Sequence, residues 1–203
     1  MKIFILAIGF LIASVLSSIA FSFDDKQLDW SAAISASVEI DRPVSEVWTY
    51  VSDTKNAIQW SIYFHHISNL PNEFPDGAVG AIRRCYRNEN EAGVFWDEKV
   101  LFIKSEKTRI IYSYNFNGYY AESKTYSAYV LQDYTYMGEN KTRLTFKTQA
   151  SAEMTAWDRI MFYFSKKQVA EIFEKNLKNI KNHIEQKPSE FAYTNKSYNF
   201  FEK

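Results

Sequence analysis

The polar side chain with the clearest chemical potential lies inside an apolar run. Within residues 94–104, Trp96, Glu98 and Val100 fall at every second position, so Glu98 would share one face of a strand with apolar neighbours. A carboxylate buried there needs a cation or hydrogen-bond donors, or it becomes neutral. The residues that could supply these partners are Arg83, Arg84, Tyr112, Lys124 and Tyr126. Glu98 could then be a polar anchor in a cavity, or a general acid or base beside a ligand. Alternatively, it faces solvent or forms a purely structural ion pair.

A second candidate set lies on the next predicted strand, residues 109–116. At alternate positions Ile110, Tyr112, Tyr114 and Phe116 would share one face. Their phenol groups could bind an oxygen atom of a ligand, and Tyr112 is a candidate catalytic residue together with Glu98. The alternative is core packing, with the hydroxyl groups reaching the rim of the sheet.

The elements that would position these side chains form a β-rich domain. Strands are predicted at 35–40, 65–70, 78–86, 94–104, 109–116, 120–134 and 142–150. Two short helices are predicted within 43–63, where Pro43 suits a first helical turn and Asp53 could cap the second helix. A long helix is predicted from Thr155 to about Gln186, followed by Pro188. Its apolar stripe would consist of Trp157, Ile160, Met161, Phe164, Val169, Ile172, Phe173, Leu177, Ile180 and Ile184.

The segment 37–60, SVEIDRPVSEVWTYVSDTKNAIQW, carries the pattern that is most informative about the fold. A strand ends in a charged residue and proline, a helix with a Val-Trp pair follows, and then an Asp and a downstream Trp. The matching residues are Asp41-Arg42-Pro43, Val47-Trp48, Asp53 and Trp60. This order resembles the START / Bet v 1-like superfamily, and within it the polyketide cyclase/dehydrase-like (SRPBCC) proteins. Two later segments, FWDEKV at 95–100 and GENKTRLT at 138–145, resemble that family's Trp-x-Glu strand and its turn into the last strand.

The resemblance covers roughly residues 35–185 and implies an α+β helix-grip fold. In that fold a curved antiparallel sheet, with two short helices after its first strand, wraps around a long C-terminal helix. The long helix is also the element that could cover the sheet, whose inner face needs a partner.

The expected function is binding of a small hydrophobic ligand, a lipid, isoprenoid or aromatic metabolite, between the sheet and the C-terminal helix. It follows from the resemblance and from the 16 Phe, 14 Tyr and 5 Trp of the chain. The expected ligand-binding residues are Arg83, Trp96, Glu98, Tyr112, Tyr114, Tyr126, Phe146 and Phe164. The hypothesis requires a cavity of about 300 Å³ or more. The alternatives are a cyclase/dehydrase-like enzyme using Glu98, Tyr112 and Arg83, and a membrane-tethered interaction protein without a ligand.

Composition and motifs argue against several other classes. The 24 basic and 24 acidic residues give no net charge, which is unlike a nucleic-acid-binding protein. With Cys85 alone, neither an intrachain disulfide nor a multi-cysteine zinc site can form. Adjacent His65 and His66 would point to opposite faces of a strand and could not easily share a metal ion. The sequence contains no HExxH motif, phosphate-binding glycine loop or nucleophile elbow, and no cofactor is expected.

Residues 3–23 contain no charge and are long enough to cross a membrane as a helix. Lys2 before them and Asp24-Asp25 after them would place the rest of the chain on the extracytoplasmic side. The segment could be a retained anchor, or a signal peptide whose cleavage leaves a secreted or periplasmic protein. The expected organisation is an anchor or signal at 1–23, a linker at 24–34, a START/SRPBCC-like domain at 35–187 and a tail at 188–203. A monomer is expected.

Overall fold

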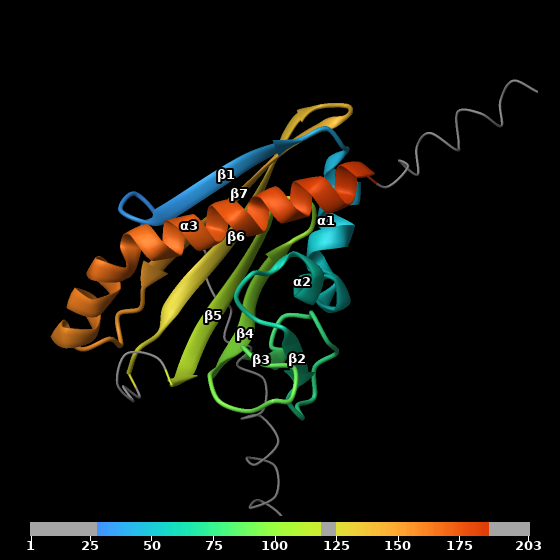
Figure 1. The fold of residues 1–203 in the computed structure, drawn as a ribbon. Helices are drawn as coiled ribbons and strands as arrows, with labels where there is room; N and C mark the ends of the chain where they lie inside the picture. The colour runs from blue at the N-terminus through green and yellow to red at the C-terminus, as the bar shows by residue number, and fades with distance from the viewer. Residues whose placement is uncertain (1–27, 119–124, 187–203) are drawn as a thin grey trace, which may run out of the picture.

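A curved antiparallel sheet gripping one long helix dominates the computed structural model of the protein, which describes residues 28–118 and 125–186 (Figure 1). Within these residues the strands are β1 (Ile34–Ile40), β2 (His66–Asn69), β3 (Ile82–Tyr86), β4 (Phe95–Lys104), β5 (Thr108–Asn117), β6 (Ala128–Gly138) and β7 (Lys141–Ala150). The helices are α1 (Val44–Ser52), α2 (Thr54–Trp60) and α3 (Ala156–Gln186). This is the helix-grip fold that the sequence predicts.

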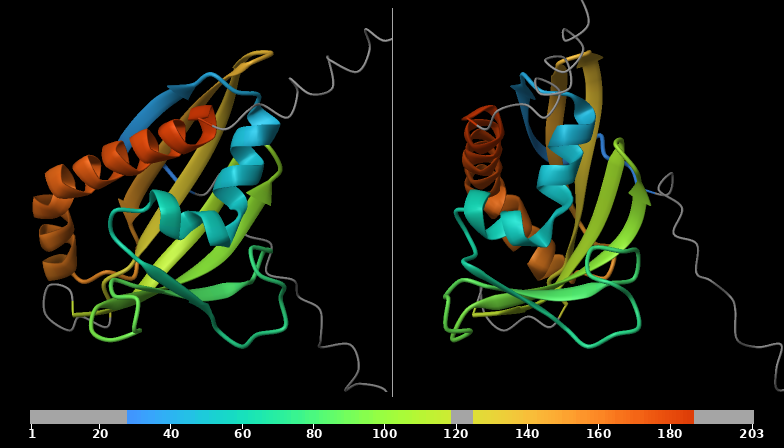
Figure 2. Two further views of the ribbon diagram at one scale, coloured as in Figure 1. Left: turned by 45° about the vertical axis from the view of Figure 1, so that its right-hand side comes forward. Right: turned by 90° about the vertical axis from the view of Figure 1, so that its right-hand side faces the viewer.

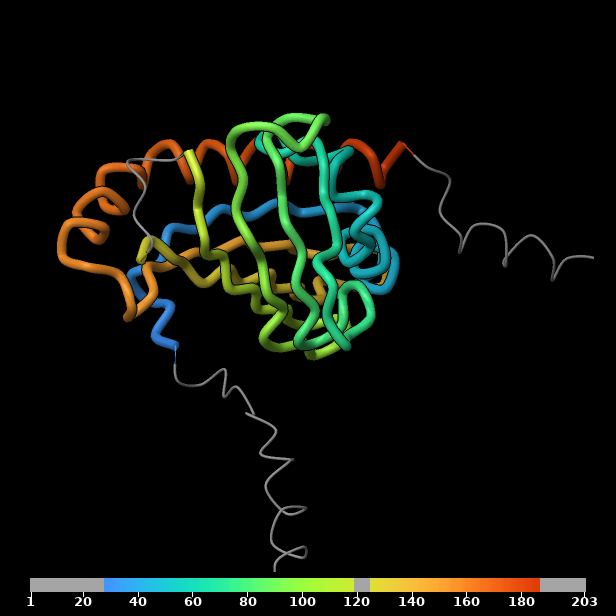
Figure 3. Tube along the Cα trace, turned by 90° about the horizontal axis from the view of Figure 1, so that it is seen from below, coloured from blue at the N-terminus to red at the C-terminus, as the bar shows by residue number. Residues whose placement is uncertain are grey.

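The seven strands form one sheet in the order β1-β7-β6-β5-β4-β3-β2, and every neighbouring pair is antiparallel. The first strand therefore pairs with the last, with Ile40 opposite Thr142. The sheet bends strongly, and α3 lies across its concave side (Figure 2). Seen from below, β1 and β7 run along α3 while β3 and β4 cross them at an angle (Figure 3). The concave side is thereby enclosed between the sheet and α3.

The local sequence explains how α1 and α2 are placed at one end of the curved sheet. Pro43 precedes α1, and Asp53 ends α1 and caps α2, its carboxylate accepting a hydrogen bond from the Lys55 amide at 2.9 Å. The two helices bury Val47 and Trp60 against the sheet. The connection between them is thus short and fixed by one capping residue.

The apolar stripe of α3 packs on the sheet over only part of its length. Leu177, Ile180 and Ile184 are buried in the main core, as predicted. The prediction is wrong for the first turns, because Trp157 and Phe164 are 64% and 74% exposed. These turns leave the line of the rest of the helix (Figure 2). The Ser165 hydroxyl donates to the Phe162 carbonyl at 2.8 Å there, a contact that favours helix bending. Phe162, rather than Phe164, is the aromatic residue turned inward.

Two strands begin later than predicted. The structure starts β3 at Ile82 instead of residue 78, and residues 125–127 lie in no strand before β6 starts at Ala128. Gly80, before β3, has φ +92°, and a Cβ atom there would lie 2.8 Å from the Phe74 ring. Glycine suits this position because other residues rarely adopt this backbone conformation, and a Cβ atom would force the Phe74 ring to move.

The predicted anchor or signal at 1–23 and tail at 188–203 lie outside the described residues. In the part of the chain that the structure describes, no helix is long and apolar enough to cross a membrane.

Candidate functional site

A cavity of about 190 Å³ lies between the concave side of the sheet and α3. Of the residues expected to bind a ligand, Arg83, Trp96, Glu98, Tyr126 and Phe146 line it. They come from β3, β4, the segment before β6, and β7, so strands distant in sequence meet around one space. The cavity also contacts α2 and α3, through residues such as Trp60 and Phe173.

The cavity is smaller than the roughly 300 Å³ that the sequence-based hypothesis requires. The reason is that aromatic rings fill much of the space between the concave side of the sheet and α3. The ring of Phe146 lies 6.0 Å from that of Trp60 and 5.7 Å from that of Phe173, and the Phe64 and Trp96 rings are 5.6 Å apart. An apolar cavity of about 150 Å³ is nevertheless enough to bind benzene. The cavity is therefore comparable in size to one that holds a single aromatic ring.

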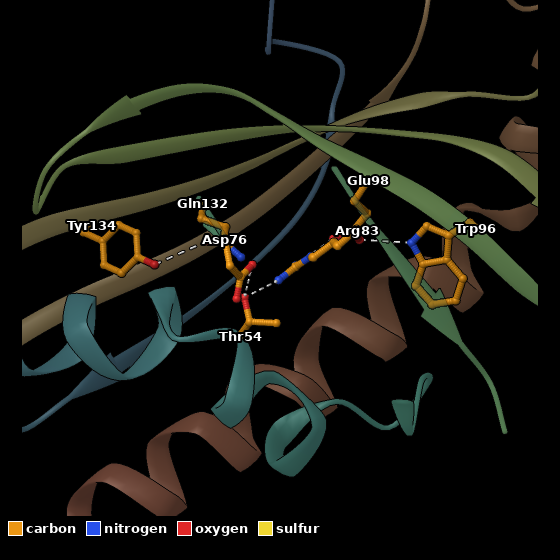
Figure 4. Close-up of polar contacts among 7 residues, drawn as sticks. All are labelled: Thr54, Asp76, Arg83, Trp96, Glu98, Gln132 and Tyr134. Carbon is orange, nitrogen blue, oxygen red and sulfur yellow. Dashed lines mark hydrogen bonds and ion pairs between the residues drawn. The ribbon is translucent and has the colours of Figure 1, made fainter. Parts of the chain in front are cut away.

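A buried ion pair forms the polar wall of the cavity (Figure 4). Arg83 donates to one carboxylate oxygen of Glu98 from Nε at 2.8 Å and from Nη2 at 2.6 Å. The indole Nε1–H of Trp96 donates to the other oxygen at 3.0 Å. Arg83 also reaches Thr54 Oγ1 at 3.4 Å, and Thr54 donates to Asp76 at 3.1 Å. Because Arg83 and Glu98 are directly opposite on β3 and β4, the sheet register itself sets this geometry.

The electrostatics keep both partners of the pair charged. Burial alone would raise the pKa of Glu98, but the Arg83 charge and the hydrogen bonds from Trp96 and Arg83 outweigh it and lower the pKa. Burial would lower the pKa of Arg83, yet the neighbouring carboxylate raises it. Glu98 is thus an ionised carboxylate whose two oxygens accept hydrogen bonds, which suits a structural ion pair better than a general acid at neutral pH.

Tyr112 and Tyr114 do not line the cavity, so the predicted face shared with Phe116 does not form. Their rings stack on the other side of the sheet, 5.3 Å apart, and the Tyr112 hydroxyl donates to Glu153 at 2.5 Å. Asn115 has φ +55°, and the β4–β5 register shifts beside it. This bulge moves Phe116 to the cavity face, while Tyr112 and Tyr114 stay outside.

Phe164 is likewise not a cavity residue, because it lies on the exposed first turns of α3. Lys124, a candidate partner of Glu98, lies outside the described residues. Arg84 pairs instead with Asp97, from Nε at 2.6 Å and from Nη2 at 3.0 Å. In the described ranges, no three His, Cys, Asp or Glu side chains are grouped to hold a metal ion.

Sequence reasoning missed several residues of the concave face. Trp60 and Gln132 line the cavity, and Arg109 lies buried on the same side of β5 as the lining residues Ile111 and Ser113. The signal that identified Glu98, a polar residue at alternate positions among apolar ones, also marks Gln132 and Arg109 in their strands. Counting alternate positions in every strand would have found them.

Comparison with known proteins supports the fold. No protein-family model and no curated protein matches the sequence. A solved START superfamily protein from Mycobacterium smegmatis is similar, with 13% identity, a TM-score of 0.55, and 76% of this chain and 97% of that chain covered. DynU16, from the dynemicin biosynthetic locus, is 19% identical with a TM-score of 0.53, covering 78% of this chain and 48% of that chain. Ara h 8.0201 is 11% identical with a TM-score of 0.50, covering 76% of this chain and 98% of that chain.

These similarities define the class of structure: the chain has the helix-grip fold of the START and Bet v 1-like proteins. The resemblance in fold that the sequence motifs indicate is thereby confirmed.

Cys85, on the cavity side of β3, is predicted to be unreactive in the folded protein. Its side chain is fully buried, and burial raises the pKa of its thiol well above the usual value. Because it is the single cysteine of the chain, mass spectrometry after iodoacetamide treatment reports on it directly. We expect no adduct under native conditions and complete labelling in denaturant. Rapid native labelling would contradict the burial of this strand.

Proposed function

We propose that this protein binds a small hydrophobic ligand, of one or two rings, in the cavity between the sheet and α3. The observation that carries the proposal is the cavity itself. Its wall is largely aromatic and aliphatic, with a few buried polar groups, which is the composition typical of small-molecule sites. The similar fold of a START superfamily protein supports it.

Native mass spectrometry of the full-length protein, followed by organic extraction, tests this proposal. A stoichiometric apolar molecule that is released on extraction would support it and identify the ligand. A protein that carries nothing and shows no saturable binding across a panel of one- and two-ring compounds would contradict it. The panel matters because a weak ligand can be lost during purification.

Filling the cavity should weaken binding without unfolding the protein. Val130 on β6 lines the cavity, so we expect Val130→Phe to weaken binding of any identified ligand by at least about tenfold, since its ring would occupy the same space. Val79→Phe is the matched control, because Val79 is 48% exposed and is not among the lining residues. Calorimetric titration of both variants, with thermal melting to check folding, gives the comparison. Equal affinities would place the ligand elsewhere.

The geometry supports the enzyme alternative less well. Of its candidate residues, Tyr112 lies on the far side of the sheet, and both oxygens of Glu98 accept hydrogen bonds from Arg83 and Trp96. A group whose pKa is lowered is a poor base near pH 7. Unchanged turnover by Glu98→Gln on any substrate found later would exclude that residue as the acid or base.

We also propose that residues 3–23 hold the domain at the extracytoplasmic face of a membrane. This proposal rests on the sequence, on the uncharged length of the segment and the charges at its two ends. A reporter fused after Lys203 tests the orientation. Activity restricted to an extracytoplasmic reporter would support the proposal, and activity restricted to the cytoplasm would overturn it.

A further inference from the structure

Arg109 on β5 is a buried cation, and two of its three guanidinium nitrogens have no hydrogen-bond partner among the described residues. Its side chain is 2% exposed, the largest of the fully buried side chains in the described ranges. Its Nε and Nη2 atoms are buried and have no hydrogen-bond partner among the described residues. Buried polar groups are nearly always hydrogen bonded, and buried charges are usually paired. Arg109 therefore needs an explanation that the fold by itself does not supply.

The two Arg109 nitrogens without a partner, Nε and Nη2, are the same two that Arg83 and Arg84 use to bind carboxylates. Arg83 holds Glu98 through Nε and Nη2, and Arg84 holds Asp97 through the same two nitrogens. In Arg84 the two nitrogens bind the two oxygens of Asp97, whereas in Arg83 both bind one oxygen of Glu98. The two nitrogens lie side by side on the guanidinium, so their spacing can match the two oxygens of a carboxylate. The same pair of donors in Arg109 thus fits a planar two-oxygen anion.

Arg109 is not itself a lining residue of the cavity, but it is next to lining residues on the sheet. It faces the same side of β5 as Ile111 and Ser113, which line the cavity, and it is opposite Gln132 of β6, which also lines it. Tyr134, two residues further along β6 on the same side, donates to Gln132 at 3.4 Å (Figure 4). To reach the guanidinium, a ligand in the cavity would have to extend along these strands beyond Gln132.

The buried charges of this side of the sheet do not balance. Arg83 and Arg109 are both buried, whereas Glu98 is their one buried carboxylate neighbour in the described residues, and it already binds Arg83. Burial, together with repulsion by Arg83, lowers the pKa of Arg109 to about 10, so it remains protonated at neutral pH. The exposed carboxylate of Asp76 acts on both arginines from a distance, but no buried carboxylate is left for Arg109. A buried positive charge beside an apolar cavity favours a ligand that carries one negative charge.

We propose that Arg109 binds the carboxylate of an amphipathic ligand whose aromatic or aliphatic body occupies the cavity. The inference rests on the proposed function and adds the chemical class: a small aromatic or arylalkyl carboxylic acid. Trp60, another lining residue, has a buried indole N–H without a partner among the described residues, so it can supply a further donor for an oxygen-bearing ligand. Ordered water at Arg109 is the competing explanation.

A matched pair of probes separates these explanations. The full-length protein is titrated calorimetrically at pH 7 with 3-phenylpropanoate and with the neutral 3-phenylpropan-1-ol. The two molecules have nearly the same shape and differ in charge. We expect the acid to bind at least about tenfold more tightly, in line with the energy of a charge-assisted hydrogen-bonded pair. Equal binding of both would overturn the role of Arg109 but leave the apolar cavity as a binding site. Binding of neither would overturn the carboxylate proposal, and the panel of one- and two-ring compounds would then decide the proposed function separately.

The variant Arg109→Met then tests the residue itself. It should remove the preference for the acid while leaving the affinity for the alcohol within about twofold. Its melting temperature without ligand should be equal to or higher than that of the wild type, because an unpaired buried charge is replaced by an apolar chain of similar length. A wild-type preference that survives in Arg109→Met would overturn the proposal. If the variant fails to fold, the comparison of the two probes on the wild type still decides the question.

Discussion

Glu98→Gln is expected to lower the free energy of unfolding by about 3–5 kcal/mol, the usual effect of breaking one side of a buried ion pair. The substitution preserves shape but removes the one carboxylate that faces Arg83, and the charge of Arg109 lies nearby. Two buried guanidinium groups that repel each other would then lack their buried carboxylate, and only the exposed Asp76 would remain to offset them. Urea unfolding followed by far-ultraviolet circular dichroism measures the change as a shift of the midpoint at constant slope.

Two controls separate this charge effect from substitution in general. Glu39→Gln makes the same chemical change in an exposed ion pair with Lys141 and Arg143, and it should have a far smaller effect. The double variant Arg83→Met/Glu98→Leu removes both charges and should recover most of the stability lost in Glu98→Gln. A double variant less stable than Glu98→Gln would mean that packing, rather than an unpaired charge, explains the loss.

The same pair predicts how stability depends on pH. The pKa of Glu98 is lower in the folded protein than its ordinary value of 4.5, so its ionised form is stabilised by folding. Above the ordinary value this contribution is fully present, and it is lost as the pH falls through the lower folded value. The difference in unfolding free energy between the wild type and Glu98→Gln should therefore be constant near neutrality and shrink below about pH 4.5. A difference that does not change on acidification would contradict the ion pair.

Ile180→Ala is expected to destabilise the protein by about 2–5 kcal/mol, the range for truncating a large buried side chain. Ile180 is 0% exposed and belongs to the core cluster formed by α3, the sheet and the two short helices. Removing most of its side chain would leave a void between the sheet and α3. The surrounding side chains are closely packed, so they can move little to fill this void. Thermal and urea unfolding give independent values.

Ile160→Ala is the matched control, since it makes the same change on the same helix. Ile160 is 46% exposed on the first turns of α3, and its truncation should alter stability by no more than about 0.5 kcal/mol. Comparable losses in both variants would show that the first turns pack against something in solution. That result would contradict the bend of α3 as described.

Two rules underlie the sequence-based predictions: faces alternate at every second residue of a strand, and helical faces repeat about every 3.6 residues. They predict the fold correctly where a strand or helix is regular. Arg83, Trp96 and Glu98 lie on stretches of β3 and β4 that pair without interruption, so counting alternate positions placed them together. Tyr112 and Phe116 were assigned to one face because the rule assumes an unbroken strand, and the bulge at Asn115 separates them. Phe164 was placed on the core side because the helical rule assumes a straight helix.

The size of the cavity could not be derived from sequence for a different reason. It depends on how the rings of Trp60, Phe146 and Phe173 pack, and residue type does not determine that arrangement. A high aromatic content fits a lined cavity and a filled core equally well. The structure shows a mixture of the two, with a small space left among many rings.

The pairing of β1 with β7 has a consequence for synthesis on the ribosome. Ile34 pairs with Thr148, a separation of more than a hundred residues, so the first strand emerges long before its partner. At about 5–20 residues per second the wait is on the order of ten seconds. During that time β1 and the apolar side of α1 have no sheet to join, and exposed strand edges promote aggregation. Nascent chains stalled before β7 should therefore depend on chaperones for solubility, whereas chains released after α3 should not.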